Sequence, residues 1–130
     1  MTNIYPSTCI YLNKSKIPES GIGVFAAKDI TKGDIIEVAP ILVLEFTDFV
    51  ETKWNLLFEY YFWMDDYVAL ALGFASMYNH SKDGNSKYEL NRENKTIIFT
   101  AIKDIKKDTE IYFNYKGSSS AKAPLWFEKK

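Results

Sequence analysis

Apolar residues occur in short runs, separated by polar turns, along almost the whole chain. Short runs rich in β-branched and aromatic residues, bounded by turn residues, are typical of strands. The pattern predicts strands at residues 8–12, 24–26, 35–38, 40–46, 86–90, 96–102 and 111–113. A polar turn at residues 91–94 joins two of these runs into a predicted hairpin. We therefore expect a mostly β fold without a long helix.

Two segments have a less decisive pattern. Residues 48–64 place aromatic and aliphatic side chains at helical spacing, which favours a short helix or irregular structure. Residues 67–72 fit either a strand or a buried helical turn. The pair Asp65-Asp66 separates the two segments, because adjacent charged side chains interrupt an apolar run.

The central stretch, residues 71–85, carries the most unusual chemistry. An apolar run leads directly into Asn79-His80-Ser81, which contains the only histidine of the chain. If these polar groups are buried, each needs a hydrogen-bond partner, since an unpaired one costs about 1–3 kcal/mol. We expect another segment or a ligand to meet them. The alternative is a helix end capped by polar residues.

One local pattern occurs twice. Residues 27–37 and residues 102–111 both contain Lys-Asp-Ile, followed by a polar turn and an apolar run. Two copies so far apart cannot stack as a repeat array. They predict two similar turn-and-strand units, contributed by opposite ends of the chain.

Composition narrows the range of functions. A length of 130 residues fits one domain with one core. The 16 basic and 17 acidic residues leave no excess positive charge, which argues against nucleic acid as a partner. A single cysteine, Cys9, excludes an internal disulfide and a zinc site with several thiolates, so no metal is expected.

The same sequence lacks the patterns of membrane insertion and secretion. Its longest apolar stretch, residues 67–78, is too short to cross a bilayer, and the first residues do not resemble a signal peptide. We therefore expect a soluble intracellular protein, without a more specific compartment.

Two glycines flank one residue in Gly21-Ile22-Gly23. Glycine permits a positive φ and the close approach of another group to the backbone. A dinucleotide-binding fingerprint is a poor interpretation, because no apolar strand directly precedes Gly21 and no amphipathic helix follows Ala26.

Three stretches together resemble the motifs of SET domains, in the same order. Gly21–Ala26 resembles the family's Gly-x-Gly motif, Gly73–Ser81 its Asn-His-Ser motif, and Glu110–Tyr115 its Glu-Leu-x-Tyr/Phe-Asp-Tyr motif. The resemblance covers about residues 8–117 and is greatest to minimal viral and microbial SET proteins without a post-SET zinc element. It implies small curved β-sheets, short helices and a C-terminal pseudoknot. The implied division is a SET domain at 1–117, with a variable insert at about 47–68, and a tail at 118–130 that closes the cofactor site.

The resemblance also implies an activity. SET proteins transfer methyl groups from S-adenosyl-L-methionine to a lysine ε-amine. Tyr115 stands at the catalytic position, and Phe113 and Tyr67 are expected in the substrate channel, where phenylalanine at 113 favours di- or trimethylation. The expected cofactor-binding residues are Gly21, Ile22, Gly23, Tyr78, Asn79, His80, Tyr115 and Trp126. Either Trp126 or its neighbour Phe127 is expected to stack on the adenine.

The implied partner is a protein with an exposed lysine. A histone tail is one candidate, which would make the nucleus the compartment, and a homodimer is one expected assembly. Four acidic side chains lie in the insert: Asp48, Glu51, Asp65 and Asp66. They are compatible with a basic peptide as substrate, although a solvated surface is the commoner explanation of such residues.

Three other interpretations stay open at this point. A SET-like module without catalysis would keep the fold and lose affinity for the cofactor. A hydrolase would use His80 with Ser81 or Cys9, but adjacent residues rarely reach the geometry of a nucleophile and its base. A plain β-rich interaction domain would use the aromatic residues only as core and contact surface.

Overall fold

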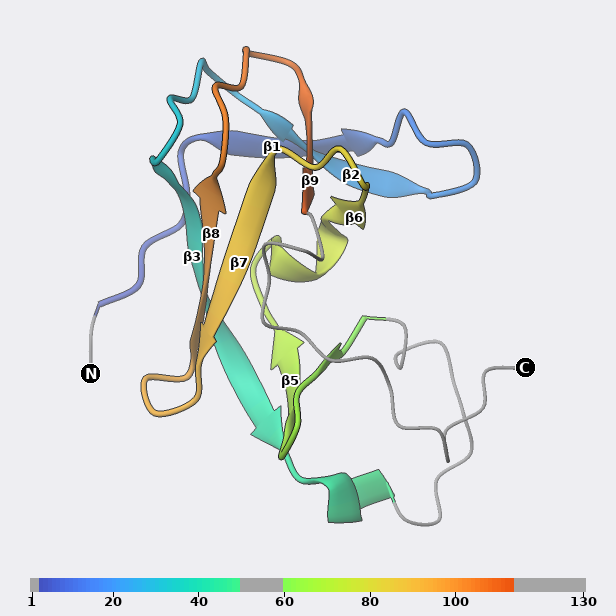
Figure 1. The fold of residues 1–130 in the computed structure, drawn as a ribbon, viewed down its shortest axis with the longest axis vertical. Coiled ribbons are helices and arrows are strands. Elements are labelled where there is room, and N and C mark those ends of the chain that lie inside the picture. The colour runs from blue at the N-terminus through green and yellow to red at the C-terminus, as the bar shows by residue number, and fades with distance from the viewer. Residues whose placement is uncertain (1–2, 50–59, 114–130) are drawn as a thin grey trace.

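The computed structural model describes residues 3–49 and 60–113 of the chain. Figure 1 shows short strands that form one strongly curved sheet, and the helices in the described part of the chain are short 3-10 segments. The elements are β1 (Ile10–Lys14), β2 (Ile22–Ala26), β3 (Ile35–Leu44), η1 (Phe46–Phe49), β4 (Phe62–Trp63), β5 (Val68–Ala71), η3 (Ala75–Met77), β6 (Asn79–His80), β7 (Ser86–Asn91), β8 (Thr96–Ala101) and β9 (Glu110–Phe113). The expected mostly β class is confirmed.

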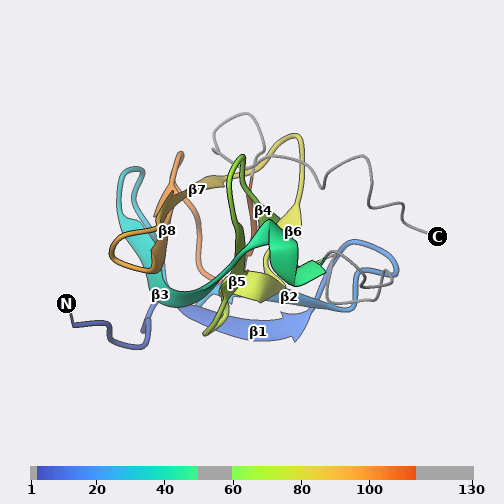
Figure 2. The same ribbon diagram turned by 90° about the horizontal axis from the view of Figure 1, so that it is seen from below.

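The sheet brings the two ends of the described chain together. Its strand order is β1-β2-β9-β7-β8-β3-β5-β4, and β6 pairs with β9 beside this path. The last strand thus lies between the first hairpin and the β7–β8 hairpin. In Figure 2 the β1–β2 pair forms a layer that crosses beneath β6. This arrangement places residues far apart in sequence at one junction.

The predicted strands 35–38 and 40–46 form a single strand, β3, because Pro40 does not interrupt it. Up to Pro40 the strand pairs with β8, and from Ile41 onward it pairs with β5. Proline lacks a backbone N–H, so it fits where a strand changes partner. The carbonyl oxygen of Pro40 still accepts a hydrogen bond from the N–H of Leu72 at 2.9 Å.

The repeated Lys-Asp-Ile segments pair with each other. Ile30 and Ile105 form an antiparallel bridge with two backbone hydrogen bonds of 2.7 and 2.8 Å. The aspartate of each copy accepts the backbone N–H of a lysine in the other: Lys32 donates to Asp104 at 2.8 Å, and Lys107 to Asp29 at 2.9 Å. The two units are therefore related by an approximate two-fold axis, which fixes β2 and β9 side by side.

The hairpin predicted at 86–102 is confirmed as β7 and β8, and it carries the centre of the core. Tyr88, Ile97 and Phe99 are at most 1% exposed. The Phe99 ring stacks on Tyr78 with ring centroids 3.8 Å apart. This packing anchors the segment that precedes Asn79.

The remaining predictions differ from the structure mainly at their boundaries. The first strand is 10–14 rather than 8–12, and the 67–72 segment contains strand β5, which spans Val68–Ala71. The described ends of the 48–64 segment belong to η1 and β4, and residues 50–59 lie outside the described chain. In the described part of the chain, no helix has the length and apolarity needed to span a membrane.

Candidate functional site

The site is organised by three segments that meet along β9. Strand β6 pairs with β9 in parallel, so Asn79 lies opposite Tyr112 and His80 opposite Phe113. The other edge of β9 pairs with β2, which follows Gly21. Figure 1 shows β2, β6 and β9 close together at this junction. The structure therefore brings the three sequence motifs together, as expected from the resemblance.

The side-chain amide of Asn79 is held in one orientation. Its NH₂ group donates to the carbonyl oxygen of Ile22 at 3.2 Å and to Glu110 Oε2 at 3.1 Å. Two acceptors on one side fix which end of the amide is the nitrogen. The opposite end, Oδ1, accepts from no donor among the described residues, so it is available to a ligand that carries N–H groups.

The Gly21-Ile22-Gly23 segment forms the adjoining wall. Gly21 has a φ of +70°, which favours glycine, and its carbonyl oxygen accepts the N–H of Ser15 at 2.8 Å. The side chain of Ile22 is 51% exposed, although Ile22 begins β2 and the other residues of this strand are buried. This exposed apolar side chain can contact a ligand held at Asn79.

Buried Glu110 connects β9 to β6 and to the loop between β1 and β2. Its Oε2 accepts from the Ser15 hydroxyl at 2.7 Å and from Asn79, and its Oε1 accepts from the Lys16 N–H at 2.7 Å and the Tyr112 hydroxyl at 2.9 Å. Burial alone would raise the pKa of Glu110, but these four donors together lower it below its ordinary value. The carboxylate is therefore charged at neutral pH. Burial and Glu110 in turn raise the pKa of Tyr112 to about 12, so its hydroxyl stays a donor.

A second buried carboxylate, Glu37, has a raised pKa, whereas the pKa of Glu110 is lowered. Among the described residues Glu37 accepts two hydrogen bonds, from the Tyr78 hydroxyl at 2.8 Å and the Phe74 N–H at 3.0 Å. Burial raises the pKa of Glu37 above 4.5, and its two donors do not offset this effect. Glu37 holds the turn that leads to Asn79, and Gly73 leaves the space for its carboxylate, since a Cβ there would come within 2.8 Å of Oε2.

This raised pKa predicts a pH dependence of stability. Since folded Glu37 binds its proton more tightly than unfolded Glu37, its contribution is fully present below about pH 4.5 and is lost as the pH rises through the folded-state pKa. From pH 4 to pH 7, the free energy of unfolding of the wild type should fall relative to that of Glu37→Gln. Urea denaturation at several pH values measures this difference.

The control is Glu89→Gln, because the Glu89 side chain is 75% exposed. Its stability difference from the wild type should not follow the trend of Glu37→Gln. A constant difference between the wild type and Glu37→Gln over this pH range would contradict the prediction.

The structure corrects the expected burial of the central triplet. Asn79 is only half-buried and His80 is exposed, with its ring 5.5 Å from that of Phe113. Desolvation lowers the pKa of His80, which keeps the imidazole neutral at pH 7. Tyr78, in contrast, is buried with its side chain bound to Glu37 and Phe99, so only its main chain can face a cofactor.

The two expected channel residues lie in different surroundings. Phe113 ends β9 opposite His80, and its ring packs against Tyr88 at 5.6 Å. Tyr67 precedes β5, is buried, and has the Arg92 guanidinium 4.9 Å from its ring centroid. The structure therefore brings Phe113 to the junction of β6 and β9, whereas Tyr67 packs beneath the β7–β8 hairpin.

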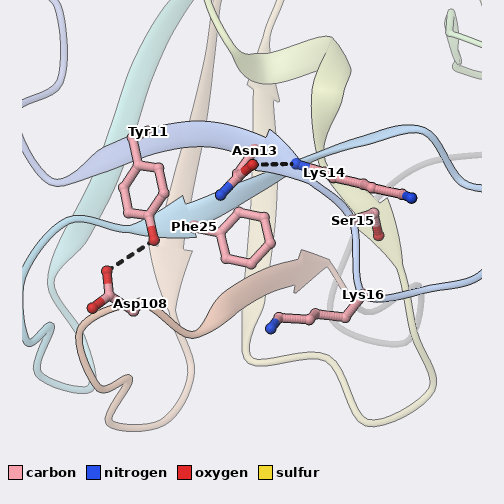
Figure 3. A pocket seen from close by; sticks show the side chains of 7 residues that line it. All are labelled: Tyr11, Asn13, Lys14, Ser15, Lys16, Phe25 and Asp108. Atoms are coloured by element: carbon pink, nitrogen blue, oxygen red, sulfur yellow. Dashed lines mark hydrogen bonds between the residues drawn. The ribbon is translucent and has the colours of Figure 1, made fainter.

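A pocket of about 380 Å³ lies on the outer face of β1 and β2, next to this junction. In Figure 3 the rings of Tyr11 and Phe25 lie side by side, and the Tyr11 hydroxyl meets Asp108. The pocket is lined by Tyr11, Asn13, Lys14, Ser15, Lys16, Phe25 and Asp108. It shares Ser15 and Lys16 with the Glu110 cluster but contains none of the residues predicted for the cofactor.

Some predicted residues lie outside the described chain: Tyr115, Trp126, Phe127 and the tail at 118–130. Ser15, Glu37 and Glu110 were not predicted as site residues. Glu110 could have been suspected from its position at the start of the last motif, whereas no sequence motif contains Ser15 or Glu37. Among the described residues, no group of His, Cys, Asp or Glu is placed to hold a metal ion.

Comparison with known proteins identifies the fold. The family model described as the SET domain matches residues 21–116, which include all three segments at the junction. The chain belongs to the SET-domain family. The mostly β curled sheet, with β6 joined to β9, is this family's architecture in the present chain.

Three relatives of this SET domain are informative. A Schizosaccharomyces pombe protein named histone-lysine N-methyltransferase, H3 lysine-37 specific, is 31% identical over 83% of this chain and 71% of its own length. The crystal structure of a Plasmodium falciparum protein described as a histone methyltransferase has a TM-score of 0.70 and 32% identity, and covers 86% of this chain and 95% of that one. A Chaetomium thermophilum polycomb repressive complex 2 bound to S-adenosylmethionine has a TM-score of 0.68 and 26% identity, and covers 85% of this chain and 15% of that one.

Proposed function

We propose that this SET domain is a protein-lysine N-methyltransferase that uses S-adenosyl-L-methionine. The observation that carries the proposal is the pairing of β6 with β9 beside Gly21–Gly23, in a chain that matches the SET family over residues 21–116. Similar proteins support the activity: one is named as an H3 lysine-37 methyltransferase, and a structurally similar complex is bound to S-adenosylmethionine.

The residues at the junction fit the methionine part of this cofactor. The Asn79 Oδ1 is an acceptor for an ammonium group, and the backbone at Gly21 and Gly23 can be approached closely because these two residues lack a Cβ. Ile22 offers an apolar contact beside them. The main chain of Tyr78, Asn79 and His80 completes the proposed site, and Tyr115 and Trp126 would cover its far side. When bound, the cofactor supplies an electrophilic methyl group on a sulfonium.

The chain must then present a neutral amine in line with that methyl group. Lysine has an ordinary pKa of about 10.4, so deprotonation at pH 7.4 costs about 4 kcal/mol. An apolar channel and a neighbouring positive charge both favour the neutral amine. Tyr115 would orient the amine through its hydroxyl, and alignment is the main catalytic requirement.

Phe113 leaves space beside the amine, which favours di- or trimethylation, and Tyr67 completes the proposed channel from the core side.

The proposed substrate is a protein segment with an exposed lysine, and a histone tail is the first candidate because similar proteins carry histone-methyltransferase names. A histone substrate would place the protein in the nucleus. The charge balance gives no basis for direct binding of nucleic acid.

A homodimer is also proposed, supported by the exposed apolar side chains of Ile35 and Leu42 on β3. We retain the division into a SET domain at 1–117 and a tail at 118–130.

Three measurements test the proposal. Calorimetry with S-adenosylhomocysteine should show binding to the purified protein, and radiolabelled methyl transfer should label histones or a protein of a cell lysate. Mass spectrometry of the labelled lysine should show di- or trimethyl products. Binding without transfer to any protein would favour an inactive SET-like module, and absence of binding would overturn the proposed function.

A further inference from the structure

Glu110 is placed to control the orientation of Asn79 Oδ1, the acceptor that the proposed site offers to an ammonium group. The Asn79 amide can rotate by 180° about its last bond, which exchanges oxygen and nitrogen at nearly the same positions. Its two contacts decide the orientation, because both Glu110 Oε2 and the Ile22 carbonyl oxygen accept hydrogen bonds and neither donates. Without Glu110, one weak contact of 3.2 Å remains to hold the amide.

Glu110 is itself fixed by donors from remote parts of the chain. Ser15 and Lys16 donate to it from 95 and 94 residues away, and Asn79 from 31 residues away. A charged carboxylate can satisfy all four donors because it has two oxygens and no hydrogen. A neutral amide in the same place cannot, since its NH₂ group would face either the Lys16 N–H or the Asn79 NH₂.

We propose that Glu110 is a positioning residue for the cofactor: its carboxylate holds the Asn79 NH₂, so that Asn79 Oδ1 faces the ammonium group of S-adenosylmethionine. The inference rests on the proposed function and deepens it. Glu110 does not contact the cofactor in this arrangement; it acts through Asn79. The close approach of Gly23 serves the same geometry, because a Cβ at Gly23 would overlap Glu110 Oε2.

The test is the Glu110→Gln variant, which keeps the size of the side chain and removes its charge. Calorimetry should be carried out with S-adenosylhomocysteine and with an analogue that lacks only the α-amino group. We expect Glu110→Gln to weaken binding of S-adenosylhomocysteine about 10- to 100-fold, which is the range for a hydrogen bond to a charged group. Binding of the deaminated analogue should change by less than about threefold, because that analogue does not use Asn79 Oδ1.

Four further variants separate positioning from general structure. Asn79→Ala should show the same selective loss, and the double variant with Glu110→Gln should lose no more than Asn79→Ala alone, since the two residues act through one contact. Glu89→Gln, an exposed carboxylate on β7, should bind both ligands like the wild type. If Glu110→Gln does not fold, Glu110→Asp keeps the charge but withdraws it by one methylene, and the same selective loss is expected.

Each outcome decides the inference. Equal losses for both ligands would show that Glu110 supports only the fold, and unchanged binding of both would show that Asn79 needs no such support; either result overturns the inference. Failure of the wild type to bind S-adenosylhomocysteine would overturn the proposed function itself, which is a different result.

Discussion

Replacing Gly23 by alanine should both destabilise the protein and abolish most of its cofactor binding. The new Cβ would overlap Glu110 Oε2 and lie 2.9 Å from Glu110 Cδ and 3.2 Å from Asn79 Nδ2. Overpacking of this kind costs about 1–3 kcal/mol. Displacement of a buried carboxylate from its donors adds about 1–3 kcal/mol more. The affinity for S-adenosylhomocysteine should fall at least about 10-fold, since the orientation of Asn79 depends on the same contact.

The matched control for this substitution is Gly33→Ala. Gly33 has a φ of +94° and open space around its Cβ position, in the turn of the first Lys-Asp-Ile unit. Its replacement should cost about 1–2 kcal/mol through backbone strain alone and should leave cofactor affinity unchanged. Urea denaturation and calorimetry on both variants give the comparison. Gly23→Ala with wild-type affinity would contradict the proposed geometry.

Replacing Tyr115 by phenylalanine should lower the rate of methyl transfer by about 100-fold or more, which is the usual cost of losing one hydrogen-bonding group that acts in the transition state. The expectation rests on the family match, which extends to residue 116, and on the position of Tyr115 in the last motif. Cofactor affinity should change far less than the rate, because the hydroxyl acts on the amine and the methyl group. Single-turnover kinetics with saturating cofactor measure the rate, and calorimetry measures the affinity.

The control for Tyr115→Phe is Tyr5→Phe, because Tyr5 is 72% exposed and precedes the first strand. It removes a tyrosine hydroxyl elsewhere and should leave the rate unchanged. A Tyr115→Phe variant as active as the wild type would remove the catalytic assignment of Tyr115 without affecting the proposed binding of the cofactor.

Local patterns in the sequence were sufficient for the class of fold and for most strands. The β7–β8 hairpin was predictable because its two apolar runs and polar turn are adjacent in sequence. Boundaries were predicted less well, as in β3, because a proline usually ends a strand unless the strand changes partner there. The three motifs located the site through a resemblance, and the structure shows that β2, β6 and β9 meet.

The sequence by itself determined that the chain is mostly β, that two similar turn-and-strand units stand at its opposite ends, and that the polar centre is Asn79-His80. Only the tertiary structure decided that the two units pair through Ile30 and Ile105, and that Glu110 collects donors from residues up to 95 positions away. The physical reason is that strand and turn preferences act over a few neighbouring residues. A buried carboxylate, in contrast, has a defined role only once the fold has placed its hydrogen-bond donors around it.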